Sequence, residues 1–178
     1  TTGNQGSLDR PQGSHLLILT SSHSLRRKAR NAIAIIELVM EQRSLGTSGQ
    51  LVSEIGFGAW AIGGGWGDQK DDDSTAALHA AIDQGVNLID TAAGYGDGRS
   101  ERLIQDVLRD RSESVLVATK TPPADGPWPP SPYCRWHDRY SAAYLRENVE
   151  QRLRNLGKDR LDLLQLHTWT AAWNDDPQ

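Results

Sequence analysis

From residue 40 onward, short apolar segments alternate with longer segments whose apolar residues recur at helical spacing. The short segments are bounded by glycine or polar residues, which is typical of buried strands. They predict strands at IGFGAWAIGG (55–64), VNLID (86–90), SVLVATK (114–120) and LDLLQLH (161–167). Ahead of them, RSLGTSGQLVSEI contains two strand-like pieces around Thr47-Ser48-Gly49, which predicts a hairpin.

The segments between these strands have the apolar spacing of amphipathic helices. One helix is expected over roughly 75–84, with N-caps from Asp71 to Ser74 and an end at Gly85. A second follows a cap at Ser100, and a third runs over 141–156 between Ser141 and Gly157. A proline-rich loop is expected from Pro122 to about Tyr140. The predicted order is a hairpin followed by βαβαβαβ.

Near-continuous apolar strands that alternate with amphipathic helices indicate an α/β fold with a parallel sheet covered by helices. Two architectures fit this order, a doubly wound sheet and a (β/α)8 barrel. No G-x-G-x-x-G motif joins a strand to a helix, as a dinucleotide-binding doubly wound sheet would require. The glycine-rich GGGWG (63–67) lacks that spacing and is interpreted as a loop.

Net charge, cysteine content and hydropathy bear on whether the chain binds nucleic acid, forms disulfides or associates with a membrane. The formal net charge of −4 argues against a general nucleic-acid binder. The single cysteine, Cys134, allows no intrachain disulfide, so a reducing, cytoplasmic location is expected. No apolar run approaches the roughly 20 residues of a membrane-spanning helix, and no membrane association is expected.

Residues 1–39 differ from the rest in being rich in serine, glycine and threonine. Their basic residues are Arg10, Arg26, Arg27, Lys28 and Arg30. Such a segment is either a targeting presequence or translated upstream sequence ahead of a start at Met40. We favour the second interpretation because the segment begins without its own methionine. It is expected to be a disordered or non-native extension, and residues 40–178 to carry the fold.

Polar residues of catalytic type end three successive predicted strands, at Asp90, Lys120 and His167. Any one of them could be a strand terminus that simply reaches water. Side chains at the carboxyl ends of parallel strands, however, converge on the active-site face of α/β folds. Three chemically complementary residues in succession therefore favour a shared site, in which Asp90 stabilises the charge of Lys120.

Tyr95 lies five residues after Asp90 in the stretch LIDTAAGYGDGRSE (88–101). Gly94 and Gly96 flank it and would let the backbone turn back over the strand ends. A lysine ammonium next to the phenol would favour proton release, so Tyr95 could protonate a carbonyl oxygen. His167 could hydrogen-bond the same oxygen and orient it.

These residues resemble the aldo-keto reductase family. The matching pieces are RSLGTSGQLVSEIGFGAW, GVNLIDTAAGYGDGRSERLI, VATK and NLGKDRLDLLQLH, and they cover essentially all of 40–178. The resemblance implies a (β/α)8 barrel with an N-terminal hairpin closing its bottom. It also implies reversible hydride transfer between NADPH and an aldehyde or ketone. The family's catalytic tetrad carries over onto Asp90, Tyr95, Lys120 and His167, with Tyr95 as the proton donor.

The resemblance further implies a cofactor and substrate site without a metal. Gly58, Ala59 and Trp60 should lie near the nicotinamide, together with Asp90. Trp60 and Trp169 should contact substrate, and the loop 122–140 resembles a substrate loop.

Only about four βα units are visible, whereas a complete barrel has about 250 residues. In the family, the later strands supply the residues that bind the carboxamide, stack on the nicotinamide and hold the 2′-phosphate. We therefore expect the N-terminal half of a barrel, with weak or no activity alone. Its open sheet edges are expected to favour self-association.

Three functions remain open at this point. The first is an NADP-dependent reductase present as a fragment, and the second is a catalytically inactive half barrel that acts as an interaction module. The third is a barrel enzyme that uses Lys120 as a Schiff-base nucleophile. We favour the first, because the third leaves Tyr95 and His167 without a role.

Overall fold

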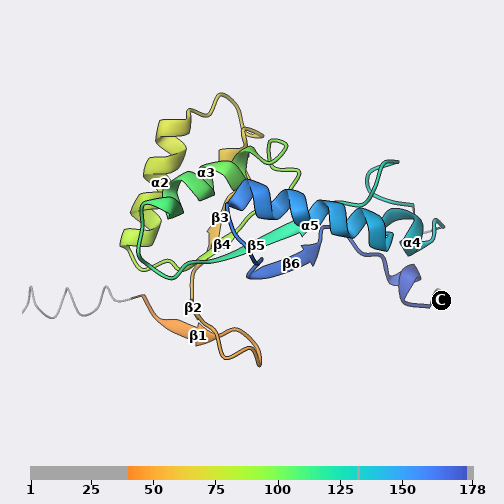
Figure 1. The fold of residues 1–178 in the computed structure, drawn as a ribbon, viewed down its shortest axis with the longest axis horizontal. Helices are drawn as coiled ribbons and strands as arrows, with labels where there is room; N and C mark the ends of the chain where they lie inside the picture. Colours follow the sequence, from red (N-terminus) through yellow and green to blue (C-terminus); the bar gives the residue numbers. More distant parts are fainter. Residues whose placement is uncertain (1–39, 132, 176–178) are drawn as a thin grey trace, which may run out of the picture. The chain divides into compact units, whose positions relative to one another are not determined.

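The computed structural model describes residues 40–131 and 133–175, and the expected extension over residues 1–39 lies outside them. The described residues form two sheets, an antiparallel pair and a parallel sheet (Figure 1). Strands β1 (Gln42–Ser44) and β2 (Leu51–Ser53) form the predicted antiparallel hairpin. The parallel sheet contains β3 (Phe57–Gly58), β4 (Leu88–Asp90), β5 (Leu116–Thr121) and β6 (Leu163–Leu166).

Helices connect the parallel strands, and one further short helix follows β6. They are η1 (Ala61–Gly63), α2 (Asp71–Asp83), α3 (Arg99–Arg109), α4 (Trp136–Arg139), α5 (Ala142–Leu156) and η2 (Ala171–Asp175). Within the described ranges, none of these helices is long and apolar enough to cross a membrane.

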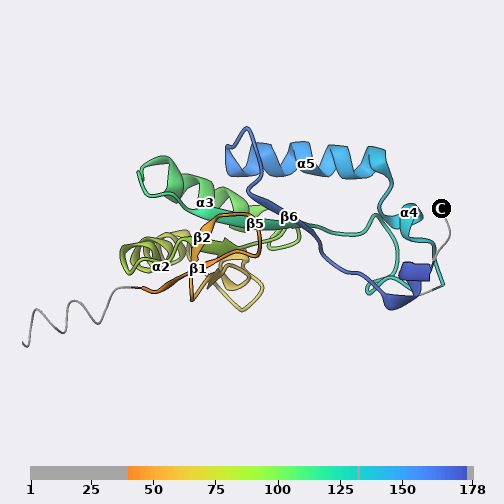
Figure 2. The same cartoon turned by 90° about the horizontal axis from the view of Figure 1, so that it is seen from below.

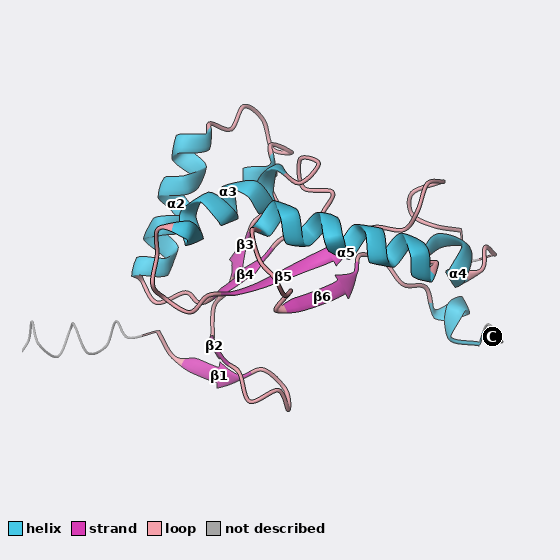
Figure 3. Cartoon of the chain, in the orientation of Figure 1, coloured by secondary structure: helices cyan, strands magenta, loops and turns pink. Residues whose placement is uncertain are grey.

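The parallel strands lie in the same order in the sheet as in the sequence, β3-β4-β5-β6. A doubly wound sheet would reverse its order at a switch point, so the uninterrupted order favours the barrel architecture. Helix α3 packs against both α2 and α5. Figure 2 shows α3 and α5 on one side of β5 and β6, and Figure 3 shows the four strands side by side. The register places Gly58 opposite Asp90 and Asp90 opposite Ala118.

The hydrophobic core lies between the sheet and these helices. Aliphatic residues fill it because Ile89 of β4 and Val117 of β5 face the helices, and α2, α3 and α5 turn apolar residues toward the sheet. Its buried members are Ala59, Ile62, Leu78, Ile82, Ile89, Leu103, Ile104, Val107, Val115, Val117 and Leu156.

Asn87, which directly precedes β4, attaches the hairpin to the amino-terminal ends of the strands. Its side-chain oxygen accepts from the Ser53 backbone N–H at 2.6 Å, and its side-chain amide donates to the Leu51 carbonyl at 3.0 Å. The Asn87 backbone N–H in turn donates to the Ser53 hydroxyl at 3.0 Å. The hairpin is therefore held by side-chain and backbone hydrogen bonds together.

The predicted starts of helices α2 and α3 are wrong. Helix α2 begins at Asp71, so its acidic residues form the first turn, where they complement the positive end of the helix dipole. Ser100 lies inside α3, and Gly98 occupies the N-cap position with a left-handed φ of 77°. The prediction for α5 is confirmed: Ser141 accepts from the Tyr144 backbone N–H, and Gly157 ends the helix with φ 60°.

The predicted strand over 55–64 is too long. Pairing with β4 extends only over Phe57–Gly58, and the chain then turns into η1, which begins just after Trp60. The predicted loop from Pro122 to Tyr140 contains the short helix α4. The last predicted strand is also trimmed, to Leu163–Leu166.

We predict that Leu78→Ala lowers the free energy of unfolding by about 2–5 kcal/mol, because Leu78 is fully buried in α2 and its loss leaves a cavity. Leu51→Ala is the matched control, since Leu51 is 59 % exposed and the expected change is within about 0.5 kcal/mol. Urea unfolding of both variants measures the difference. Equal effects would contradict the position of the core.

Candidate active site

Lys120 contacts two of the other predicted catalytic residues, Asp90 and Tyr95, at the carboxyl ends of β4 and β5. Its ammonium nitrogen donates to the Asp90 carboxylate at 2.5 Å and to the Thr91 backbone carbonyl at 2.9 Å. It lies 3.3 Å from the Tyr95 hydroxyl. The Lys120 side chain is 15 % exposed, whereas that of Asp90 is 48 % exposed. The cation is thus largely withdrawn from water and held by oxygen atoms from two neighbouring segments.

Tyr95 reaches this cation because two glycine-containing loops pack backbone against backbone. A side chain at Gly63 would place its Cβ 2.6 Å from the Tyr95 carbonyl carbon. Gly96 has φ 67°, and a Cβ there would lie 2.1 Å from the Gly63 carbonyl oxygen. Gly96 therefore makes the expected turn, whereas Gly94 keeps an ordinary φ and borders the pocket instead.

His167 follows β6, and its backbone N–H donates to the Thr121 carbonyl at 2.9 Å. Its ring meets the Tyr95 ring edge to face, with centroids 5.9 Å apart. Burial is the largest cause that lowers the pKa of His167, and the charge of Lys120 lowers it further, while Asp90 opposes the shift. The neutral imidazole is therefore favoured near neutral pH, where it can donate one hydrogen bond.

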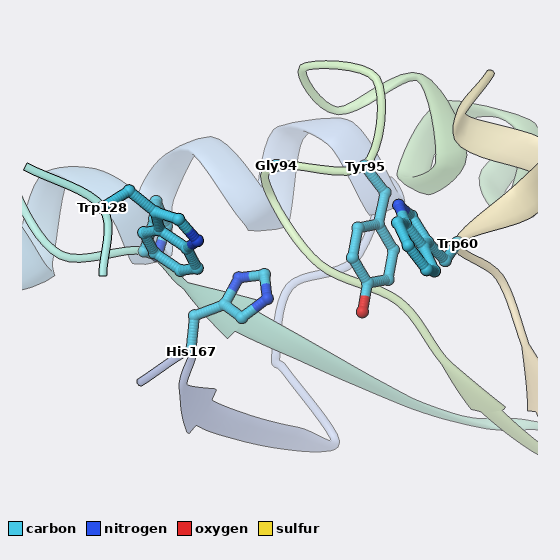
Figure 4. Close-up of a pocket in the computed structure, with 6 residues that line it drawn as sticks. Trp60, Gly94, Tyr95, Trp128 and His167 are labelled. Carbon is cyan, nitrogen blue, oxygen red and sulfur yellow. The ribbon is translucent and has the colours of Figure 1, made fainter. Parts of the chain in front are cut away.

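A pocket of about 520 Å³ opens over these side chains. Figure 4 shows Trp128 on one side of His167, with Tyr95 and Trp60 on the other. Trp128 meets the His167 ring edge to face at 5.4 Å. The pocket walls are therefore mostly aromatic. The lining residues are Trp60, Gly94, Tyr95, Pro122, Trp128 and His167.

The other residues singled out from the sequence fall in different places. Gly58 and Trp60 are exposed at the end of β3, whereas Ala59 is fully buried and its backbone N–H donates to the Asp90 carbonyl at 2.8 Å. Trp169 is half exposed and lies with Trp173 in an aromatic cluster near η2. Trp169 does not line the pocket that contains Tyr95.

Trp128 and Thr91 belong to the site but were not singled out from the sequence. Trp128 belongs to the Trp-Pro-Pro stretch of the loop 122–140, and that stretch was the only available signal. Thr91 participates through its backbone carbonyl, which no side-chain pattern reveals.

The arrangement is suited to proton transfer. No group of residues suited to holding a metal ion occurs in the described part of the chain. A phenol, an ammonium, a carboxylate and an imidazole converge at one end of the sheet, where a phenol next to a cation can give up a proton to an oxygen.

A family model, curated relatives and solved structures all match the chain to the same family. The sequence model of the Aldo/keto reductase family matches residues 54–177. The chain is similar to the aldo-keto reductase YhdN of Bacillus subtilis, with 39% identity over 131 residues, which cover 72% of this chain and 38% of YhdN.

Two solved structures resemble this one. A holo-form aldo-keto reductase of Bacillus halodurans has a TM-score of 0.61 and 32% identity, covering 78% of this chain and 42% of its own. An aldo-keto reductase of Klebsiella pneumoniae in complex with NADPH has a TM-score of 0.58 and 30% identity, covering 74% and 40%. The chain thus spans well under half the length of these relatives. The predicted fold class, the N-terminal half of a (β/α)8 barrel, is confirmed.

We predict that the His167 imidazole titrates with a midpoint below about 6.5, its ordinary pKa, because burial and Lys120 disfavour its charged form. The unfolded chain then binds the proton first, so stability is lost as pH falls from about 6.5 toward the lower folded pKa. Two-dimensional NMR of the ring protons checks this, with His167→Gln to assign the signal. A midpoint at or above the ordinary value would refute the expectation.

Proposed function

The chain belongs to the aldo/keto reductase family, and we propose that its site takes part in the NADPH-dependent, reversible reduction of an aldehyde or ketone to an alcohol. The observation that supports this most strongly is the position of Lys120. Its ammonium donates to the Asp90 carboxylate and lies 3.3 Å from the hydroxyl of Tyr95, which lines an open pocket. A lysine that served as a Schiff-base nucleophile would need a free amine, whereas Lys120 is engaged by three oxygen atoms.

Tyr95 is the proton donor in this proposal. A carbonyl oxygen within hydrogen-bond distance of its hydroxyl takes the proton as the carbonyl carbon is reduced. The phenolate left on Tyr95 is stabilised by the Lys120 ammonium at 3.3 Å. Asp90 holds that ammonium in place, and the neutral His167 imidazole donates a hydrogen bond that orients the carbonyl.

The residues at the end of β3 suit a flat ring such as nicotinamide. A Cβ added at Gly58 would meet nothing within 4 Å, so the backbone there is open to close approach. The Trp60 ring, 53 % exposed, stands next to Tyr95 with centroids 6.5 Å apart. When bound, NADPH supplies the hydride that reduces the carbonyl carbon.

Gly58, Trp60 and the half-exposed Asp90 would border the nicotinamide, whereas Ala59 acts through its backbone. Among the described residues, those that line the pocket include no lysine or arginine for the cofactor phosphates. We therefore assign phosphate binding to the part of the relatives' length that this chain does not span.

The length of the relatives also bears on the activity expected of this chain. The relatives are more than twice as long as their match to this chain. We propose that the chain of residues 40–178 supplies the proton-transfer residues and one side of the cofactor site, and that it has weak or no turnover by itself.

We predict that Tyr95→Phe in the full-length protein lowers the rate of carbonyl reduction by about 10²–10⁴-fold, the usual contribution of a general acid. NADPH binding, followed by quenching of tryptophan fluorescence, should be retained because the ring remains in place. Tyr133→Phe is the matched control, since Tyr133 is 95 % exposed and outside the pocket. Turnover near the wild-type rate in Tyr95→Phe would remove Tyr95 from the role of acid.

A second candidate function is an interaction module that associates through its sheet edge. Strand β6 pairs with β5 alone among the described strands, which leaves its other edge open to another chain. Leu164 and Leu166, which lie on the same face of β6, are 36% and 38% exposed.

We predict that the 178-residue chain self-associates through β6, and that Leu166→Lys shifts it toward the monomer by placing a charge on that apolar face. Light scattering coupled to size-exclusion chromatography measures the mass. Leu51→Lys is the control, because Leu51 is also exposed but lies on the hairpin. A wild-type chain that is monomeric at its highest soluble concentration would exclude this interface.

A further inference from the structure

The first turn of α3 contains two adjacent polar residues, Ser100 and Glu101, that are both fully buried. A carboxylate is almost never buried to this extent unless it is paired. Neither residue touches the pocket or belongs to the proposed tetrad. Both nevertheless connect to residues that directly adjoin the tetrad.

Ser100 connects α3 to the ends of β3 and β4. Its hydroxyl donates to the Ala59 carbonyl at 2.9 Å and lies 2.9 Å from the Thr91 hydroxyl. Thr91 is fully buried, and its backbone carbonyl accepts from the Lys120 ammonium at 2.9 Å. Ser100 therefore fixes one of the acceptors that hold the catalytic cation.

Glu101 connects the same turn to β5 and α5. Its carboxylate accepts from the Thr119 hydroxyl at 2.6 Å and from the Asn155 side-chain amide at 2.7 Å. Arg152 Nε lies 2.8 Å from the carboxylate, close enough for an ion pair, although its N–H does not point at the oxygen. Thr119 directly precedes Lys120, so Glu101 fixes the strand segment that carries the lysine.

The two connections meet at Lys120. One holds the carbonyl that accepts from its ammonium, and the other holds the backbone from which its side chain extends. We propose that Ser100 and Glu101 are positioning residues that act through Thr91 and Thr119 to set the place of the Lys120 ammonium between Asp90 and Tyr95. This inference rests on the proposed function of the tetrad.

Thr121 offers an internal comparison. Thr119 and Thr121 flank Lys120 on β5, both are fully buried, and both lie on the opposite face of the strand from Lys120. The Thr119 hydroxyl donates to Glu101, whereas the Thr121 hydroxyl has no hydrogen-bond partner in the described ranges. Removing each hydroxyl in turn separates positioning from the general effect of altering this strand.

The test uses the full-length protein with Thr119→Val, which keeps the shape of the side chain but removes its hydroxyl. Thr119→Ser restores the hydroxyl, and Thr121→Val is the control. Three quantities are measured: the NMR signal of the Lys120 ammonium, kcat and KM for 4-nitrobenzaldehyde with NADPH, and the midpoint of urea unfolding. A purely structural role would change only the midpoint.

We expect Thr119→Val to shift or broaden the Lys120 signal and to lower kcat on the order of tenfold, with KM little changed, because small displacements of catalytic groups are costly. Thr119→Ser should restore both quantities, and Thr121→Val should change neither. Should Thr119→Val not fold, Ser100→Ala removes the other connection and is measured in the same way.

An unchanged Lys120 signal and kcat in the folded variant, with only a lower unfolding midpoint, would overturn the proposal. The NMR signal also separates this inference from the proposed function. If the wild-type protein reduces no aldehyde, the reductase assignment fails, and the response of the Lys120 signal to Thr119→Val still decides whether the turn positions the lysine.

Discussion

The ammonium of Lys120 is the group on which the arrangement of the site depends. An ammonium that is only 15 % exposed has lost much of its hydration and needs replacement oxygen atoms at hydrogen-bond distance. Asp90, Thr91 and Tyr95 supply them, one as a charge, one as a backbone dipole and one as a phenol. The electrostatic requirement of one partly buried cation therefore holds a strand end and a loop in a fixed geometry.

This geometry depends on the register of the sheet. Asp90 stands opposite Ala118, two residues before Lys120, so its carboxylate and the lysine side chain point to the same side of the sheet. A slip of one residue would turn the carboxylate toward the helices. The apolar contacts of Ile89 and Val117 in the core exclude that slip, because they would be moved to the opposite face. The packing of Ile89 and Val117 against the helices therefore fixes the positions of Asp90 and Lys120 on the opposite face of the sheet.

The sequence predicted those features that local pattern or strand ends determine. Asp90, Lys120 and His167 could be found because parallel strands bring their carboxyl ends together, and α5 could be bounded because Ser141 and Gly157 are strong capping residues. The start of α3 could not, because the Ser100 hydroxyl is used by Ala59 and Thr91 rather than as a cap.

Glu101 and Trp128 show a second limit of sequence pattern. Glu101 is buried by partners as distant in sequence as Asn155, and Trp128 reaches His167 from a loop without a regular period. Such positions depend on tertiary contacts, which a strand or helix pattern does not record. The cofactor and substrate positions inferred by resemblance remain predictions.

The hydrogen bonds of Asn87 to the hairpin lie at the opposite ends of the strands from Lys120. The proposed catalytic groups and the hydrogen bonds that hold the hairpin therefore lie at opposite ends of one sheet, and no described side chain of the hairpin lines the pocket. A substitution that loosens the hairpin at Asn87 can therefore lower the stability of the fold without changing any residue of the pocket.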